Sequence, residues 1–204
     1  MSNNTQNTAT QPSVGKRPPV ILVSGLPRSG TSMMMKMLAS GGIDIYTDNV
    51  RQADEDNPQG YYEVEKVKRL QENSTWLHHV RGRAVKIVSS LLYYVPFSLP
   101  YKVIFMRRDM QEILRSQKKM LERSGQATEQ AANDSLALKF ETHLQKIVAW
   151  IEAQKHIDCL YIDYKQAIDD PLSCAQNVQA FLGRPLDIEA MAAAVNSSLY
   201  RNRA

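Results

Sequence analysis

A glycine-rich segment near the start of the chain has the residue types and spacing of an anion-binding loop. Gly25 and Gly30 are separated by four residues, and Thr31 and Ser32 follow, between the apolar run VILVSG and a segment with helical character. Glycines allow a tight loop whose backbone N–H groups point inward, and the N-terminus of the next helix adds its positive dipole end. The pattern predicts a site for an anion with several oxygens; incidental glycines at a strand–helix junction are the alternative interpretation.

The cation of this loop argues against a nucleoside triphosphate. Triphosphate loops have the pattern GxxxxGK[ST], in which the lysine contacts the β- and γ-phosphates and the hydroxyl binds Mg²⁺. Here Thr31 occupies the lysine position, and the cation, Arg28, stands three residues earlier, inside the loop. A phosphosulfate, which has less charge and needs no metal, therefore fits this loop better.

A second segment combines a buried strand, two arginines and a helix. Arg107 and Arg108 end the apolar run YKVIFM, and Ser116 follows Arg108 by eight positions. The C-terminal edge of a parallel sheet is where α/β folds bind ligands. The range from Lys102 to Arg123 holds seven basic and three acidic residues, an excess equal to the net charge of +4 of the whole chain. A solvated basic helix face explains the later cations, but not the pair at the strand end.

Together, the two segments resemble sulfotransferases that use 3′-phosphoadenosine 5′-phosphosulfate, and the resemblance covers most of the chain from Pro19 onward. GLPRSGTS is similar to the 5′-phosphosulfate loop of that family. The resemblance implies that Arg28 contacts the bridging and sulfuryl oxygens. It also implies that Arg108 and Ser116 bind the 3′-phosphate, with Arg107 as the alternative in register. The residues that would cradle the 5′-phosphate are Ser29, Gly30, Thr31 and Ser32.

Sulfuryl transfer also needs a base for the acceptor and cations beside the transferred group. Cytosolic animal members of the family use a histidine base in a Lys-Thr-His stretch. In the comparable stretch VKIVSSLL, Lys86 matches the lysine, but Val88 or Ser89 stands at the histidine. Other branches use a glutamate, so Glu63, at a predicted helix start, is either the base or a helix-capping carboxylate. Lys86 is either a catalytic cation or an edge lysine.

The sequence therefore predicts an enzyme, a sulfotransferase that moves a sulfuryl group from 3′-phosphoadenosine 5′-phosphosulfate to a hydroxyl or amine of a small-molecule or biopolymer acceptor. We expect no metal, because no carboxylate pair or His/Cys cluster has metal-ligand spacing. One alternative is a P-loop nucleotide or small-molecule kinase without the usual lysine. Another is a non-catalytic nucleotide-binding module of the same fold. Arg201 and Arg203 either close over the 3′-phosphate or form a basic terminal segment.

These segments need a scaffold that brings them to one sheet edge. Buried-strand candidates begin at Val20, Ala84, Tyr101 and Cys159. They alternate with helices that we expect over residues 31–40, 63–77, 109–123, 128–155 and 171–182. This order predicts an α/β, P-loop-type three-layer fold, with a parallel sheet covered by helices on both faces.

Composition supplies the remaining expectations. The 204 residues suffice for one domain, which we place at residues 19–204, after a polar tail over residues 1–18 that cannot bury enough apolar surface to be ordered. The excess of 25 basic over 21 acidic residues is too mild for a nucleic-acid-binding surface. Two cysteines without ligand spacing, no secretory signal and no long apolar stretch predict a cytoplasmic protein without a membrane span.

Overall fold

The computed structural model describes residues 17–48, 50, 60–123 and 134–196. Within these ranges, four parallel strands form one sheet in the order β2-β1-β3-β4. The strands are β1 (Val20–Gly25), β2 (Ala84–Lys86), β3 (Tyr101–Arg107) and β4 (Ile157–Asp163). Every residue of the central strand β1 is buried, as expected for a parallel sheet that is covered on both faces. All four predicted strands are confirmed.

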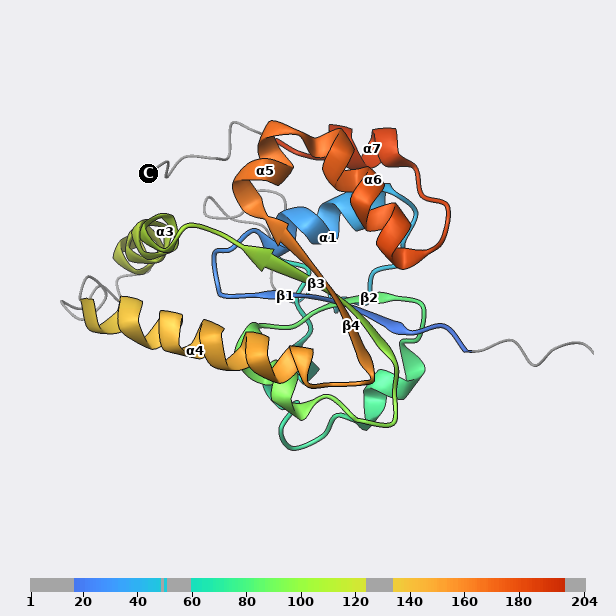
Figure 1. Ribbon diagram of the computed structural model, residues 1–204, viewed down its shortest axis with the longest axis horizontal. Coiled ribbons are helices and arrows are strands. Elements are labelled where there is room, and N and C mark those ends of the chain that lie inside the picture. The colour runs from blue at the N-terminus through green and yellow to red at the C-terminus, as the bar shows by residue number, and fades with distance from the viewer. Residues whose placement is uncertain (1–16, 49, 51–59, 124–133, 197–204) are drawn as a thin grey trace, which may run out of the picture.

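Helices cover both faces of this sheet and complete a three-layer fold (Figure 1). One face is covered by α1 (Thr31–Ser40), α5 (Tyr164–Asp169), α6 (Pro171–Leu182) and α7 (Ile188–Ala193). The other face is covered by α4 (Asp134–Glu152), the short α2 (Glu65–Lys68) and the 3₁₀ helices η1 (Thr75–His79) and η2 (Ser89–Tyr94). The helix α3 (Met110–Arg123) lies beyond the ends of the strands (Figure 1). The predicted α/β class and the P-loop-type layering are confirmed.

Alternate residues of the strands build two separate cores. Val20 and Leu22 of β1 face α4 and the 3₁₀ helices, whereas Ile21 and Val23 face α1 and the C-terminal helices. The second core includes the fully buried Met34, Met35 and Met37 of α1. The run of methionines is therefore core filler, a role that suits their flexible side chains.

The segment that leads to β2 differs from the sequence prediction. The helix expected over residues 63–77 is wrong, because only α2 and η1 are helical there and residues 69–72 form turns. The side chain of Asn73 accepts hydrogen bonds from the backbone N–H and the hydroxyl of Thr75, a local pairing that competes with a continuous helix. Glu63 consequently lies two residues before α2, preceding the extended Val64, and not at the first residue of a helix.

Helix ends elsewhere follow the predicted signals. Asp109 accepts a hydrogen bond from the backbone N–H of Glu112 at the start of α3, and Pro171 opens α6, which ends before Gly183. The long helix expected over residues 128–155 is observed as α4, and its predicted first residues lie outside the described ranges. The polar tail lies almost wholly outside them as well. The described helices include none whose length and apolar character would allow it to cross a membrane.

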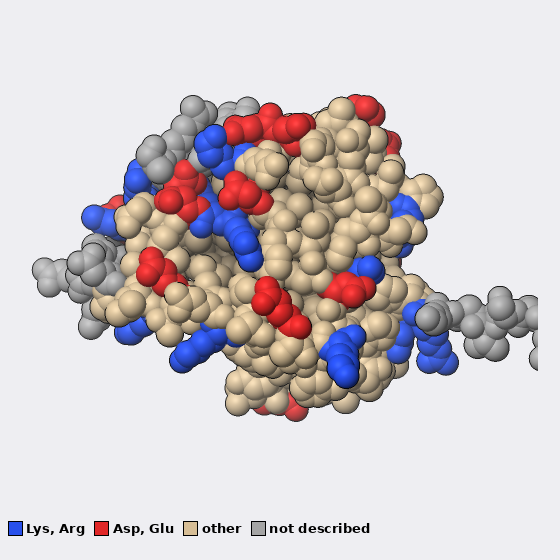
Figure 2. Space-filling view, in the orientation of Figure 1, with Lys and Arg blue, Asp and Glu red and all other residues tan. Residues whose placement is uncertain are grey.

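Charged side chains of both signs are interspersed on the face shown in Figure 2. The Lys and Arg side chains coloured there do not gather into one continuous block, and acidic side chains lie between them. This face therefore differs from the single-signed surface that is typical of nucleic-acid-binding proteins.

Candidate active site

The loop between β1 and α1 lies at the C-terminal edge of the sheet, and its backbone depends on two glycines. The backbone φ angle is 148° at Gly25 and 101° at Gly30. A Cβ atom on Gly25 would lie 2.7 Å from the carbonyl oxygen of Met106, and one on Gly30 would lie 2.3 Å from the ring of Tyr164. Side chains are thus excluded at both positions, and the loop can pack closely before the N-terminus of α1.

The hydroxyl of Ser29 is buried inside this loop without a hydrogen-bond partner in the described part of the chain. Ser29 is 1% exposed, and its Oγ atom has no donor or acceptor within reach there. Buried hydroxyls in folded proteins nearly always form hydrogen bonds. A ligand oxygen at the loop would provide the missing partner, so the loop residues fit an oxyanion such as a phosphate.

The second motif packs directly against the loop. The Nε atom of Arg28 donates a hydrogen bond to Ser116 Oγ at 2.9 Å, and Nη1 of Arg108 donates to the carbonyl oxygen of Arg28 at 3.0 Å. From the sequence, we expect Arg28 at the sulfuryl end of the donor and Arg108 and Ser116 at its 3′-phosphate. The structure brings them together in one chain of contacts, so the two predicted phosphate motifs adjoin each other at the sheet edge.

The two neighbouring arginines have different surroundings. The Arg108 side chain is 7% exposed, forms an ion pair of 2.8 Å with Glu112, and lies over the ring of Tyr164. Arg107 is exposed, and its guanidinium lies 3.8 Å from the centroid of the Tyr161 ring. Arg108 is thus the arginine that contacts the loop, as in the preferred register.

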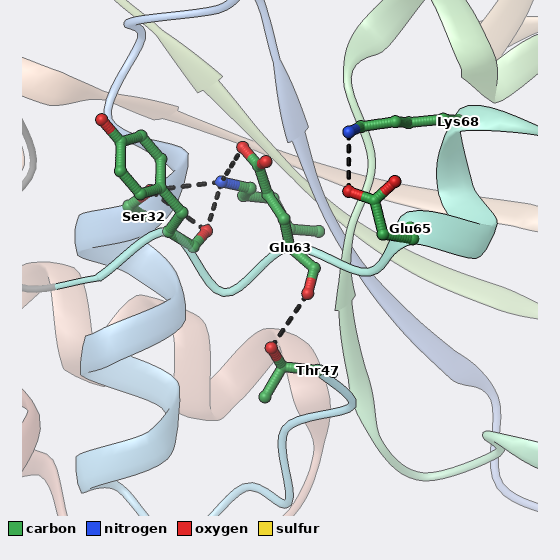
Figure 3. Close-up of polar contacts among 7 residues, drawn as sticks. Ser32, Thr47, Glu63, Glu65 and Lys68 are labelled. Atoms are coloured by element: carbon green, nitrogen blue, oxygen red, sulfur yellow. Dashed lines mark hydrogen bonds and ion pairs between the residues drawn. The ribbon is translucent and has the colours of Figure 1, made fainter. Parts of the chain in front are cut away.

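A lysine, Lys86, joins the loop to the candidate base, and Figure 3 labels its two side-chain partners, Ser32 and Glu63. The Nζ atom of Lys86 donates to Ser32 Oγ at 3.3 Å and to the carbonyl oxygen of Tyr61, and it forms an ion pair of 3.1 Å with Glu63 Oε1. The Lys86 side chain is only 8% exposed, although β2 is an edge strand, whereas that of Glu63 is 30% exposed. The ammonium group therefore lies between the first turn of α1 and a carboxylate that solvent can reach.

The backbone around Glu63 fixes the direction of this carboxylate. Thr47 Oγ1 donates a hydrogen bond to the carbonyl oxygen of Glu63 at 2.9 Å, and the preceding residue, Tyr62, has a positive φ of 52°. Such a φ is uncommon for a bulky residue. The negative charge of Glu63 is balanced by the Lys86 ammonium, and not by the helix N-terminus that we expect from the sequence.

His143, a residue without a motif of its own in the sequence, lies beside the stretch that corresponds to the histidine base of other family members. His143 Nε2 of α4 lies 2.8 Å from Oγ of the buried Ser89, and the ring of Tyr93 packs edge-on against the imidazole. Burial lowers the pKa of His143, which keeps the imidazole neutral near pH 7. No sequence signal marks this pair, because 54 positions separate the two residues.

Arg201 and Arg203 lie outside the described residues. The described ranges contain no group of three or more His, Cys, Asp or Glu side chains placed to hold a metal ion.

A parallel sheet with an anion loop and a second basic motif at its C-terminal edge defines a P-loop-type protein. The model of the sulfotransferase domain family matches residues 18–203, so the chain belongs to the sulfotransferase family and is a sulfotransferase enzyme. No curated protein matches the chain.

Solved structures of bacterial sulfotransferases share this fold. The sulfotransferase domain of the Synechococcus PCC 7002 olefin synthase has 14% identity and a TM-score of 0.56, and the match covers 96% of this chain and 83% of that one. Sulfotransferase STF1 from Mycobacterium tuberculosis H37Rv has 18% identity and a TM-score of 0.51, with coverages of 93% and 74%. STF9 from Mycobacterium avium has 13% identity and a TM-score of 0.51, with coverages of 93% and 69%.

Proposed function

We propose that this sulfotransferase takes its sulfuryl group from 3′-phosphoadenosine 5′-phosphosulfate and transfers it to a hydroxyl or amine of an acceptor. The observation that carries the proposal is the position of Lys86. Its ammonium contacts Ser32 of the anion loop and the Glu63 carboxylate at once, so a cation and a candidate base lie together at the loop.

The residues of the two motifs fit this donor. Arg28 would contact the sulfuryl end, and Arg108 and Ser116 would bind the 3′-phosphate. The Ser29 hydroxyl, which has no hydrogen-bond partner among the described residues, and the closely packed loop support a phosphate there. The buried position of Arg108 supports the register in which Arg108, not Arg107, binds the 3′-phosphate. The loop residues that would hold the 5′-phosphate are Ser29, Gly30, Thr31 and Ser32. When bound, the donor supplies an activated sulfuryl group on a phosphate leaving group.

The position of Lys86 also argues against the kinase alternative. Ser32 occupies the position whose hydroxyl binds Mg²⁺ in triphosphate loops. Here the Lys86 ammonium lies 3.3 Å from that hydroxyl and places a fixed positive charge where such loops hold the metal. We therefore propose a reaction without a metal ion.

Glu63 is the proposed base. Its carboxylate would take the proton from the acceptor hydroxyl or amine as the nucleophile attacks, a role worth about 10²–10⁴-fold in rate. Lys86 would keep the carboxylate oriented and would stabilise negative charge that develops at the loop. The 30% exposure of the Glu63 side chain leaves it accessible to an acceptor from solvent.

The test compares ligands before it compares acceptors. In a thermal-shift assay, 3′-phosphoadenosine 5′-phosphate should raise the melting temperature, because any ligand that binds only the native state stabilises it. Stabilisation by ATP·Mg²⁺ alone would contradict the proposal and favour the kinase. Sulfated product from a panel of hydroxyl and amine acceptors should follow. Donor binding without product from any acceptor would indicate a non-catalytic module.

A further inference from the structure

The ion pair between Arg108 and Glu112 is almost completely buried. The two side chains are 7% and 4% exposed, and Nε of the arginine lies 2.8 Å from Oε2 of the glutamate. Removing two charges from water is costly, so a buried pair is weak evidence for a stabilising role. Its contacts indicate a different role, because Arg108 reaches the anion loop.

Arg108 directly follows β3 and contacts three other parts of the fold. Its Nε is bound by Glu112 of α3, its Nη1 donates to the carbonyl oxygen of Arg28 in the loop, and its guanidinium lies 4.4 Å from the centroid of the Tyr164 ring at the start of α5. The same Tyr164 ring packs against Gly30. The loop backbone is thus contacted at residue 28 by Arg108 and at residue 30 by the aromatic ring beneath that arginine.

Residue 28 is where the loop needs such a contact. Arg28 has a φ of 70°, in the left-handed region that side chains other than glycine rarely occupy. A hydrogen bond from a buried, charged donor to its carbonyl oxygen stabilises this conformation, and bonds that involve an ionised group are roughly twice as strong as neutral ones.

Glu112 is itself held in place. It lies one helical turn after Arg108, and its backbone N–H donates to Asp109 Oδ1 at 3.1 Å. The capped helix end therefore fixes the backbone of Glu112, and its carboxylate stays in position to pair with Arg108.

We propose that Glu112 is a positioning residue that acts through Arg108 to fix the backbone of loop residues 26–30, so that the 5′- and 3′-phosphate subsites form as one unit. The naming of the subsites rests on the proposed donor. The coupling between Glu112 and the loop is a property of the free chain and can be tested without any ligand.

Hydrogen exchange in the free protein is the first test. The Ser29 amide is bonded to the Leu26 carbonyl, and the Met34 amide to the Gly30 carbonyl, so both report on loop order. Glu112→Gln keeps the shape but removes the charge, and we expect these amides to exchange at least about fivefold faster than in the wild type, the lower end of ordinary coupling between sites. Amides in the middle of β3 should change less.

The matched control is Glu122→Gln. Glu122 lies on the same helix and pairs with Lys118 at the same spacing of four residues, but both side chains are at least half exposed. This variant should leave loop exchange unchanged. If Glu112→Gln folds poorly, Arg108→Lys serves instead, because a lysine keeps the charge but lacks the fork that reaches Glu112 and the Arg28 carbonyl together. Unchanged loop exchange in a folded variant of either residue overturns the proposal.

Calorimetry with two nucleotides is the second test. If Glu112 served only the 3′-phosphate subsite, Glu112→Gln would weaken binding of 3′-phosphoadenosine 5′-phosphate and leave adenosine 5′-phosphate unaffected. The proposal instead predicts that both ligands bind at least about fivefold more weakly. A loss confined to the bisphosphate overturns it. A wild-type protein that binds neither nucleotide contradicts the proposed donor, and the exchange test then decides the coupling alone.

Discussion

Two carboxylates reach the anion loop, each through one basic residue. Glu112 binds Arg108, which contacts the carbonyl oxygen of Arg28, and Glu63 binds Lys86, which contacts the hydroxyl of Ser32. The first carboxylate is 4% exposed and the second 30%. A buried carboxylate can orient its partner but cannot meet an acceptor. The exposed one can do both, and this difference is why we propose Glu112 for positioning and Glu63 for proton transfer.

The largest effect that we expect concerns the exposed carboxylate. Glu63→Gln keeps the shape of the side chain but removes its basicity, so kcat should fall by at least about 10²-fold. Binding of 3′-phosphoadenosine 5′-phosphate, measured by calorimetry, should not change. Glu65→Gln is the control, since Glu65 lies two residues away and forms an exposed pair with Lys68 (Figure 3). A near-normal kcat in Glu63→Gln would leave the base unassigned.

The next effect concerns the buried arginine. Arg108→Ala should weaken binding of 3′-phosphoadenosine 5′-phosphate by about 1.5–3 kcal/mol, the range for hydrogen bonds to charged groups. Arg107→Ala should cost less, because Arg107 is exposed and lies over Tyr161. Titration calorimetry of both variants decides the register, and the reverse order would move the 3′-phosphate site to Arg107.

A smaller effect distinguishes Glu63 from the neutral histidine. His143→Gln should change kcat far less than the 10²-fold expected for loss of the base. Its effect should appear in the pH dependence of stability. Burial lowers the pKa of His143, so below the ordinary imidazole value of about 6.5 the unfolded state binds more protons than the native state.

The contribution of His143 to the free energy of unfolding should therefore be constant between about pH 7 and 8 and should fall as the pH drops below about 6.5. His143→Gln should reduce the slope of the free energy of unfolding against pH by the equivalent of up to about one bound proton. Urea titrations between pH 5 and 8 measure this slope. His78→Gln, at an exposed position, is the control. Burial also lowers the pKa of His156, and the contribution of His156 to this slope should be the same in both variants as in the wild type. A slope that His143→Gln leaves intact contradicts this account.

For removal of metal ions, we expect no effect on turnover. Turnover should survive EDTA, because the Lys86 ammonium provides the positive charge beside Ser32. Sulfate transfer from 3′-phosphoadenosine 5′-phosphosulfate, followed with and without the chelator, tests this. Strict dependence on Mg²⁺ would restore the kinase hypothesis.

Local patterns in the sequence were sufficient for most of the fold. The buried strands and the capped ends of α3 and α6 follow from apolar runs and from residues such as Asp109 and Pro171, whose preferences act over a few positions. The helix expected over residues 63–77 was wrong, because a local hydrogen bond at Asn73 and burial of separate short segments outweighed helical spacing. Short helices such as α5 and α7 have too few residues to produce a periodic signal.

The candidate site was predictable only within each motif. The loop and the Arg108 segment were visible because their residues are close in sequence. Contacts between motifs were not, since Arg28 and Ser116 are 88 positions apart and Lys86 and Glu63 are 23 apart. Such pairs arise from the parallel order of the strands, which brings the strand ends to one edge whatever their separation along the chain.

The ammonium of Lys86 has one further consequence. A divalent ion exchanges with the medium and contributes two positive charges, whereas a lysine is covalently part of the chain and contributes one. A terminal sulfuryl group carries a single negative charge, and a fully ionised terminal phosphoryl group carries two. Because the Glu63 carboxylate already balances the charge of Lys86, the pair is close to neutral and leaves little positive charge for a dianionic terminal group. If the proposed donor is correct, this lysine–glutamate pair would favour a monoanionic sulfuryl group over a dianionic phosphoryl group, whatever the supply of free metal in the surroundings.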